Sequence, residues 1–257
     1  MALAYDNSAV GTNTSLTFTV GSGANRIIFC LLFWDTSEGS TPTATWNGTS
    51  LTLIVTANVG VTTSRVSAFY LINPASGSHA LAIGGLSAVD DLFGISYTGA
   101  RQTSQPDNHN TDSPTTGTTE STSLTTNLPN CWILSIVRTN SQVASGTGVV
   151  TTVRQTDAAV ILDSNGPVGV PGSYTCSFSQ GGSSTSWGVI NISIAPMPFL
   201  SLTESLVLTD TVAKTKKQTR NMSESVILTD TVTKRSNKFH DPQTKSLVSW
   251  NDQNKSV

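Results

Sequence analysis

The sequence is poor in the residues on which most enzyme chemistry depends. It contains three histidines and three cysteines in 257 residues, and charged residues make up only 12% of the chain. The histidines (His79, His109 and His240) do not accompany a nucleophile-elbow pattern, and no glycine-rich phosphate loop precedes a helical pattern. The adjacent acids Asp90 and Asp91 would point to opposite faces of a strand. We therefore expect no enzyme activity, no catalytic residues and no cofactor.

Long apolar runs are absent as well. The run RIIFCLLFW at residues 26–34 has the length of a strand, whereas a membrane span needs about 18 apolar residues. The N-terminal stretch MALAYDNSAVGTNTS has neither the basic start nor the apolar centre of a secretory signal. The odd number of cysteines, Cys30, Cys131 and Cys176, indicates buried free thiols in a protein made in a reducing compartment.

Lysine is missing from the first 200 residues, which carry five arginines and ten acidic residues. All seven lysines and the other two arginines follow position 200, together with six acidic residues. This change coincides with the stretch APMPFL at residues 195–200, where two prolines interrupt regular structure. We therefore divide the chain into a body, residues 1–198, and an extended basic C-terminal arm, residues 199–257. The acidity of the body argues against nucleic-acid binding.

The body contains many short strand patterns separated by turn residues. The chain's 39 threonines and 35 serines favour strands and turns, and no segment sustains a period of 3.6 residues. Asn47-Gly48 is a two-residue type I′ hairpin sequence. We predict an all-β body, a β-sandwich or jelly roll. Its strands are expected at residues 15–20, 26–33, 43–46, 50–55, 65–72, 79–84, 92–98, 121–126, 131–137, 148–153, 158–163, 173–179 and 187–194.

Residues 13–195 are expected to form a two-sheet sandwich. The residues expected in its core share an apolar or aromatic side chain in a strand pattern: Phe29, Leu31, Trp46, Phe69, Tyr70, Trp132, Ile190 and Ile192. One polar stretch, residues 99–120, interrupts the strand patterns and contains Asp107, His109 and Asp112. Carboxylate and amide oxygens suit calcium, but their spacing here matches no calcium-loop motif. We interpret this stretch as a solvated surface loop.

The arm contains nearly the same nonapeptide twice. ESLVLTDTV occupies residues 204–212, ESVILTDTV occupies residues 224–232, and each is followed by basic residues. Each copy is expected to form one short strand, and isolated strands need a sheet to pair with. We therefore predict an assembly arm that adds its strands to a neighbouring subunit. Its candidate residues are Leu206, Leu208, Val212, Val226, Leu228, Val232, Lys214, Lys216, Lys217, Arg220, Lys234, Arg235 and Trp250.

Several motifs of the body resemble a known module. They are Asn25-Arg26 before an apolar strand, TWNGTSLT at residues 45–52, VSAFYLINPASGSH at residues 66–79 and ISYTG at residues 95–99. These motifs resemble a β-sandwich module of phage and metagenomic virion and surface proteins, some of which end in ES-x-x-LTDTV repeats. The resemblance covers about residues 13–195. It implies a structural module of a virion, assembled in the host cytoplasm and exposed outside the cell, and it implies no catalytic residues.

Together with this resemblance, the repeated basic arm leads us to expect a bacteriophage virion structural protein of the decoration or fibre type, a homo-oligomer or a partner of other virion proteins. The alternative is a carbohydrate-binding adhesion module on a virion or cell surface, which would stack a host-surface glycan on an exposed aromatic ring. Trp34, Trp46, Trp132 and Trp187 lie in or beside apolar strand patterns and are expected in the core. Trp250 lies in the polar arm and is the better candidate for an exposed or docked aromatic.

Overall fold

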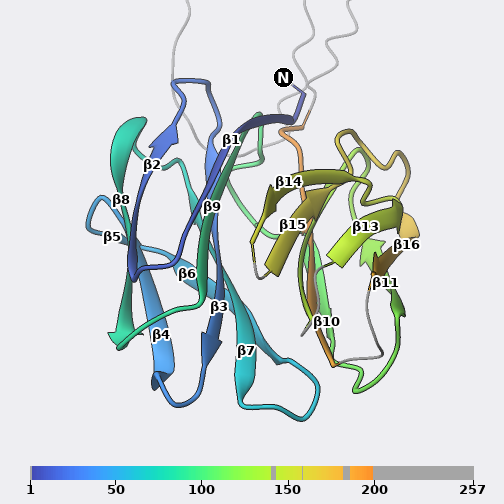
Figure 1. Cartoon of the computed structure of the whole chain (residues 1–257). Coiled ribbons are helices and arrows are strands. Elements are labelled where there is room, and N and C mark those ends of the chain that lie inside the picture. Colours follow the sequence, from blue (N-terminus) through green and yellow to red (C-terminus); the bar gives the residue numbers. More distant parts are fainter. Residues whose placement is uncertain (1, 140–142, 158, 182–185, 199–257) are drawn as a thin grey trace, which may run out of the picture. The chain divides into compact units, whose positions relative to one another are not determined.

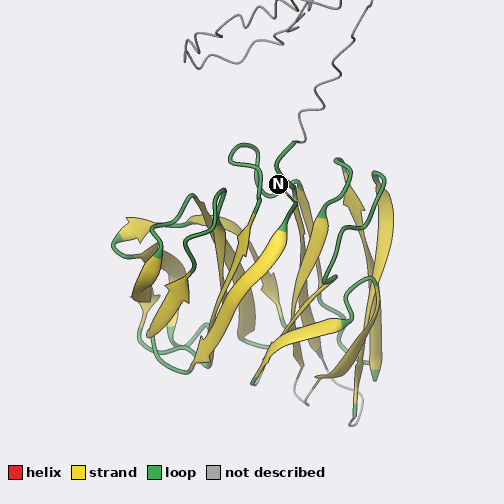
Figure 2. Cartoon of the chain, turned by 90° about the horizontal axis from the view of Figure 1, so that it is seen from above, coloured by secondary structure: helices red, strands yellow, loops and turns green. Residues whose placement is uncertain are grey.

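The computed structural model describes residues 2–139, 143–157, 159–181 and 186–198. Within these ranges the chain forms strands and loops and contains no helix (Figure 2). The all-β class predicted from the sequence is therefore confirmed. The chain divides into two units, Met1–Phe199 and Leu200–Val257, and the described residues all belong to the first.

The N-terminal half of this unit consists of two antiparallel sheets packed face to face. The first inner sheet contains, in spatial order, β1 (Ala4–Gly11), β9 (Asp91–Thr98), β3 (Ile27–Asp35), β7 (Ser64–Ile72) and β6 (Thr52–Asn58). The first outer sheet contains β2 (Ser15–Val20), β8 (Gly77–Leu86), β4 (Gly39–Trp46) and β5 (Thr49–Ser50). Because the chain passes directly from β5 to β6, these two pieces form one strand that changes sheet. The resulting strand order is that of a jelly roll.

The C-terminal half repeats this topology beside the first half (Figure 1). The second inner sheet contains β10 (Asn108–Asp112), β17 (Trp187–Ile194), β12 (Trp132–Thr139), β15 (Ala159–Asp163) and β14 (Thr152–Thr156). The second outer sheet contains β11 (Thr119–Thr126), β16 (Gly172–Gln180) and β13 (Val143–Gly148). Each strand takes the place of its counterpart in the first half. The body is thus two jelly rolls in tandem.

The two inner sheets pack against each other, so the body has three apolar cores. The central core joins the inner sheets through residues such as Leu31 and Ile136. Each outer core lies between an inner and an outer sheet, for example at Cys30 and at Phe178. The expectation of two sheets was therefore wrong in number, although each half is a two-sheet sandwich. Inner strands are covered on both faces, which is why residues 27–34 form an unbroken apolar run.

Most of the residues predicted for the core are buried. Seven of them are at most 7% exposed, namely Phe29, Leu31, Trp46, Phe69, Trp132, Ile190 and Ile192. Tyr70 is only partly buried and packs at the side of the central core. It lies opposite Thr52 on β6, the last strand of its sheet, so one side of its environment is open.

The interpretation of residues 99–120 as a surface loop is wrong for much of that stretch. The first strand of the second jelly roll, β10, lies within it and pairs with β17 from Asn108 opposite Ser193 to Asp112 opposite Val189. β10 is the last strand of its sheet, and none of its side chains is fully buried. An edge strand of this kind needs no apolar alternation, so the sequence pattern did not reveal it.

The same side-chain contacts recur at the start of each jelly roll. The Asp6 carboxylate accepts hydrogen bonds from the backbone N–H of Gly21, at 2.8 Å, and from the hydroxyl of Ser96, at 2.7 Å. The next residue, Asn7, donates its amide N–H to the carbonyl oxygen of Thr19 at 2.8 Å. Asp6 therefore ties the end of β2 to the last strand of the roll, β9.

Asp107 has the same arrangement in the second jelly roll. Its carboxylate accepts hydrogen bonds from the backbone N–H of Asn127, at 2.8 Å, and from the hydroxyl of Ser193, at 3.1 Å. Asn108, the next residue, donates to the carbonyl oxygen of Thr125 at 2.8 Å. The correspondence of side chains as well as strands identifies the halves as two copies of one structural unit.

Candidate functional site

The residues predicted for the assembly arm lie between positions 206 and 250, outside the described residues. Their role therefore stays a prediction. A surface that receives such an arm, or another ligand, would lie on the body, which is the part of the chain that the structure describes.

The four tryptophans of the body are core residues, as the sequence indicates. Trp34, Trp46, Trp132 and Trp187 are all at most 7% exposed. The indole N–H of Trp34 donates to the hydroxyl of Ser67 at 2.9 Å. None of these four rings is therefore an exposed platform on which a sugar would stack.

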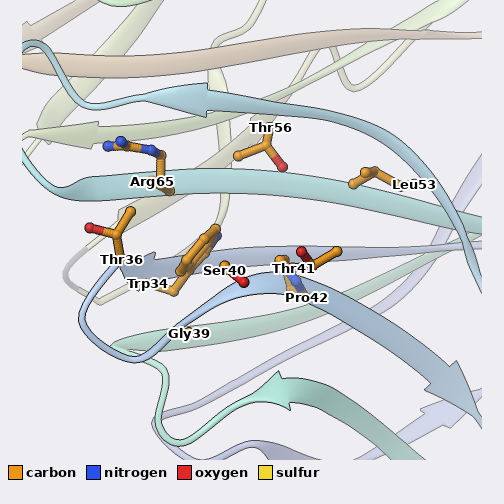
Figure 3. Close-up of a pocket in the computed structure, with 9 residues that line it drawn as sticks. All are labelled: Trp34, Thr36, Gly39, Ser40, Thr41, Pro42, Leu53, Thr56 and Arg65. Atoms are coloured by element: carbon orange, nitrogen blue, oxygen red, sulfur yellow. The ribbon is translucent and has the colours of Figure 1, made fainter.

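A groove lies on the first jelly roll between β4 and β6, the last strand of the first inner sheet. It has a volume of about 330 Å³. Figure 3 places Trp34, Thr36 and Arg65 at one end of the groove and Leu53 at the other. We call it the edge groove; its lining residues are Trp34, Thr36, Gly39, Ser40, Thr41, Pro42, Leu53, Thr56 and Arg65.

The polar side chains of the edge groove form hydrogen bonds within the fold. The guanidinium of Arg65 donates to the backbone carbonyls of Thr62 and Ser64, at 2.9 and 2.8 Å. Thr56 shares a hydrogen bond with Ser67, which also accepts the Trp34 N–H. The groove therefore offers hydroxyls and apolar surface beside a strand edge, an arrangement that fits an extended peptide.

Leu53 at the end of this groove has a counterpart in the second jelly roll. In β6 the pairing with β7 shifts between Leu53 and Val55, and in β14 the pairing with β15 shifts between Val153 and Gln155. Both edge strands thus carry a β-bulge at the same position of the roll. Leu53 and Val153, one on each bulge, are equally exposed at 46%. Bulges at sheet edges re-aim side chains, and here both place an apolar side chain in solvent.

A buried charged network lies between the two jelly rolls. Asp163 on β15 is fully buried and accepts hydrogen bonds from the Arg154 guanidinium, at 2.8 Å, and from the Tyr97 hydroxyl, at 2.9 Å. Arg154 also lies over the ring of Tyr5, 4.1 Å from its centroid. Burial, followed by the negative charge of Asp163, raises the pKa of Tyr97 well above its usual value. These contacts join β1 and β9 of the first roll to β14 and β15 of the second.

A second set of charged residues crosses the same interface. The Asp91 carboxylate on β9 accepts a hydrogen bond from the backbone N–H of Ala159 on β15 at 2.6 Å. Arg138 on β12 lies over the ring of Phe33, 4.3 Å from its centroid. Burial lowers the pKa of Arg138, and the negative charge of Asp91 acts in the opposite direction. These polar groups are used to join the two rolls.

Asp112 and Glu120 form a pair of carboxyl groups on β10 and β11. Burial raises the pKa of Glu120 to about 7, and the hydrogen bond and charge of Asp112 add to this effect. Asp112 also accepts a hydrogen bond from the backbone N–H of Ser113 at 2.7 Å. The raised pKa belongs to Glu120, and two carboxyl groups alone do not define a binding site.

The described parts of the chain contain no cluster of three or more histidine, cysteine or acidic side chains that could hold a metal ion. His109 is exposed on β10, whereas His79 packs edge-on against Trp46 in the first roll. Asp107, the other candidate in the polar stretch, is engaged in the contacts at the start of the second roll. Over the same ranges, no helix has the length and apolar character needed to cross a membrane.

No protein-family model matches the sequence, and no curated protein matches it. We therefore infer a function from the chain's own residues and geometry.

Proposed function

We propose that this protein is a structural component of a bacteriophage virion, of the decoration or fibre type. Its body would be the displayed part, and its C-terminal arm would join it to further copies of itself or to other virion proteins. The jelly-roll topology supports this proposal, because that fold is used by viral capsid proteins and also by lectins. Fold alone does not define function, so the arm has to distinguish between these uses.

The repeated nonapeptide is the observation that carries the proposal. Residues 204–212 and 224–232 are nearly identical strand-forming sequences that follow a body already complete in its own sheets. A short strand gains stability by adding to the edge of a sheet on another subunit. The basic residues after each repeat complement a body with ten acidic and five basic residues, so we expect this association to weaken at high salt.

The polar chemistry of the body supports a structural role over an enzymatic one. The buried or partly buried carboxylates of Asp6, Asp91, Asp107 and Asp163 all accept hydrogen bonds that tie strands or jelly rolls together. Hydrogen bonds of this kind hold the strands and the two rolls in one arrangement, as a structural role requires.

Removing residues 201–257 tests the proposal directly. We expect the shortened chain to keep the circular dichroism spectrum of a β protein but to stay monomeric and to be absent from assembled particles. Electron microscopy of the native particle should show full-length copies at regular positions. Normal assembly of the shortened chain would refute the role of the arm.

A carbohydrate-binding adhesion module is the second candidate, favoured by the edge groove with its hydroxyl groups and Arg65. It ranks second because the four tryptophans of the body are buried, and sugar sites depend on exposed aromatic faces. Glycan-array binding by the full-length protein that is lost in Arg65→Ala would support it. Binding that survives this change, or no binding, would exclude the groove as a sugar site.

A further inference from the structure

The body and the arm are both duplicated. The body contains two jelly rolls of the same topology, and the arm contains two copies of one nonapeptide, whose starts are 20 residues apart. Two equivalent strands to be docked match a body that presents two equivalent docking positions. Such docking positions must be exposed and must occur at the same place in each of the two rolls.

Exposed apolar side chains occur at one pair of equivalent places in the two rolls. Across the described ranges, the strongly exposed large apolar residues are Leu53, Val61, Val153 and Val170. Val61 and Val170 lie outside the strands, whereas Leu53 and Val153 lie on β6 and β14 at the equivalent bulges. Among the described residues, Leu53 and Val153 therefore form the exposed apolar pair that the duplication relates, and both lie on strands.

β6 and β14 are the last strands of their inner sheets, so each pairs with a neighbour on one side only. Apart from the Arg154 carbonyl on β14, which accepts a hydrogen bond from the Ser8 hydroxyl at 3.4 Å, such an edge presents N–H and C=O groups that can receive another strand. Proteins often protect such edges with charge, and an apolar side chain in place of a charge leaves the edge open to pairing with another strand. Beside β6 the edge groove adds room for the side chains of an incoming peptide.

We propose that β6 and β14 are the acceptor edges for the arm of a second copy, each receiving one nonapeptide repeat as an added strand. Leu208 of the first repeat and Leu228 of the second would cover the apolar side chains at the bulges, Leu53 and Val153. This inference rests on the proposed role of the arm and identifies the surface to which it binds.

The length between the repeats fits this arrangement. The 11 residues 213–223 separate the two nonapeptides and extend to about 36–40 Å. A domain of about 200 residues has a radius of gyration of about 16 Å, so one linker can reach from one edge to another on the same body. The linker carries Lys214, Lys216, Lys217 and Arg220, which suit the acidic body that it would cross.

Lysine substitutions in the full-length chain test the acceptor edges. We expect Leu53→Lys and Val153→Lys each to weaken self-association about ten-fold or more in sedimentation velocity, the effect of losing one buried aliphatic side chain. The double variant should behave like the chain that lacks residues 201–257. Val61→Lys and Val170→Lys are matched controls, because they add the same charge at exposed valines outside the proposed edges. Circular dichroism should show that every variant keeps the β fold.

The outcomes separate this inference from the proposed function. If the truncated chain fails to associate but the double lysine variant associates normally, or if the controls weaken association equally, the acceptor edges are wrong and the arm keeps its role. If the truncated chain associates normally, both proposals fail.

A crosslink gives an independent measurement in which the occupant is identified. Leu53→Cys combined with Leu208→Cys should form a disulfide between two chains under mild oxidation, since the three native thiols are buried. The single variants are the controls and should not give this product. A crosslink only within one chain, or none in an associated sample, would overturn docking from a second copy.

Discussion

Replacing Arg154 with methionine tests whether the buried charged network holds the two jelly rolls together. The Arg154 side chain is 13% exposed, and its Nε lies 2.8 Å from an oxygen of the fully buried Asp163. Removing one partner of a buried ion pair costs about 3–5 kcal/mol, because the other charge stays buried without compensation. Asp163 keeps hydrogen bonds from the Tyr97 hydroxyl and from the backbone N–H of Asn165. We therefore expect Arg154→Met to lower the free energy of unfolding by about 3 kcal/mol, near the lower end of this range.

The free energy of unfolding of the full-length chain can be measured by urea denaturation. Tryptophan fluorescence should report on this interface, because the ring of Trp132 lies edge-on to Tyr97 with 5.8 Å between centroids. Arg101→Met is the matched control: the Arg101 guanidinium makes one exposed hydrogen bond, to Thr103, and surface changes of this kind alter stability by about 0.5 kcal/mol or less. A loss below about 1 kcal/mol for Arg154→Met would refute the structural role of the pair.

Tyr97 adds a pH-dependent test of the same network. Its pKa in the folded protein is raised far above the usual 10.0 by burial and by Asp163. Above pH 10 the tyrosine of the unfolded chain loses its proton while the folded chain keeps it. Stability must therefore fall as the pH rises above 10. Tyr97→Phe should lack this contribution, and an unchanged alkaline profile in that variant would contradict the assignment.

Three further predictions concern the cores and the carboxyl pair. Trp132→Ala should lower the free energy of unfolding by about 3–5 kcal/mol, and an unchanged melting temperature would contradict its burial. The native thiols should react slowly with an aromatic disulfide reagent, because burial raises the pKa of Cys131 to about 11 and of Cys176 to about 12; rapid reaction before unfolding would contradict this. Glu120 has its pKa raised from 4.5 to about 7, so its contribution to stability is complete below pH 4.5 and is lost as the pH rises through about 7. Glu120→Gln should therefore raise the melting temperature at pH 8 and leave it nearly unchanged at pH 4.5, and equal shifts at both would contradict the raised pKa.

Local patterns in the sequence identified most strands of the body. The alternation of Leu16, Phe18 and Val20 predicts β2 because that strand has one face in solvent, and Asn47-Gly48 predicts the turn between β4 and β5. Both turn residues have positive φ, 47° and 78°, as a type I′ turn requires. Such signals depend on residues close together in the chain, so they can be read without the fold.

Other elements left no local signal or a misleading one. The edge strands β1 and β10 were missed because their side chains are polar or only partly buried. The pattern at residues 148–153 predicts one strand, whereas β13 ends at Gly148 and β14 begins at Thr152. The chain passes between these strands from the second outer sheet to the second inner sheet. Composition alone does not indicate which sheet a residue joins.

The candidate surface was the least predictable part of the body. Leu53 belongs to an ordinary apolar strand pattern, SLTLIV, and nothing in that pattern indicates that its side chain is exposed. The bulge on β6, and its match on β14, arise from pairing with strands elsewhere in the chain. The arm is the opposite case. Its repeat and its lysine content can be read from the sequence, whereas its residues lie outside the described part of the chain.

The all-β class, the burial of the thiols and tryptophans of the body, and the division between an acidic body and a basic repetitive arm can be read from the sequence. These properties follow from composition and from patterns over a few residues. The fold is needed to show that the body is two jelly rolls, that their inner sheets share a core, and that Leu53 and Val153 are equivalent. Sheet pairing joins distant segments, such as β1 with β9, and its energy depends on partners that no local window contains.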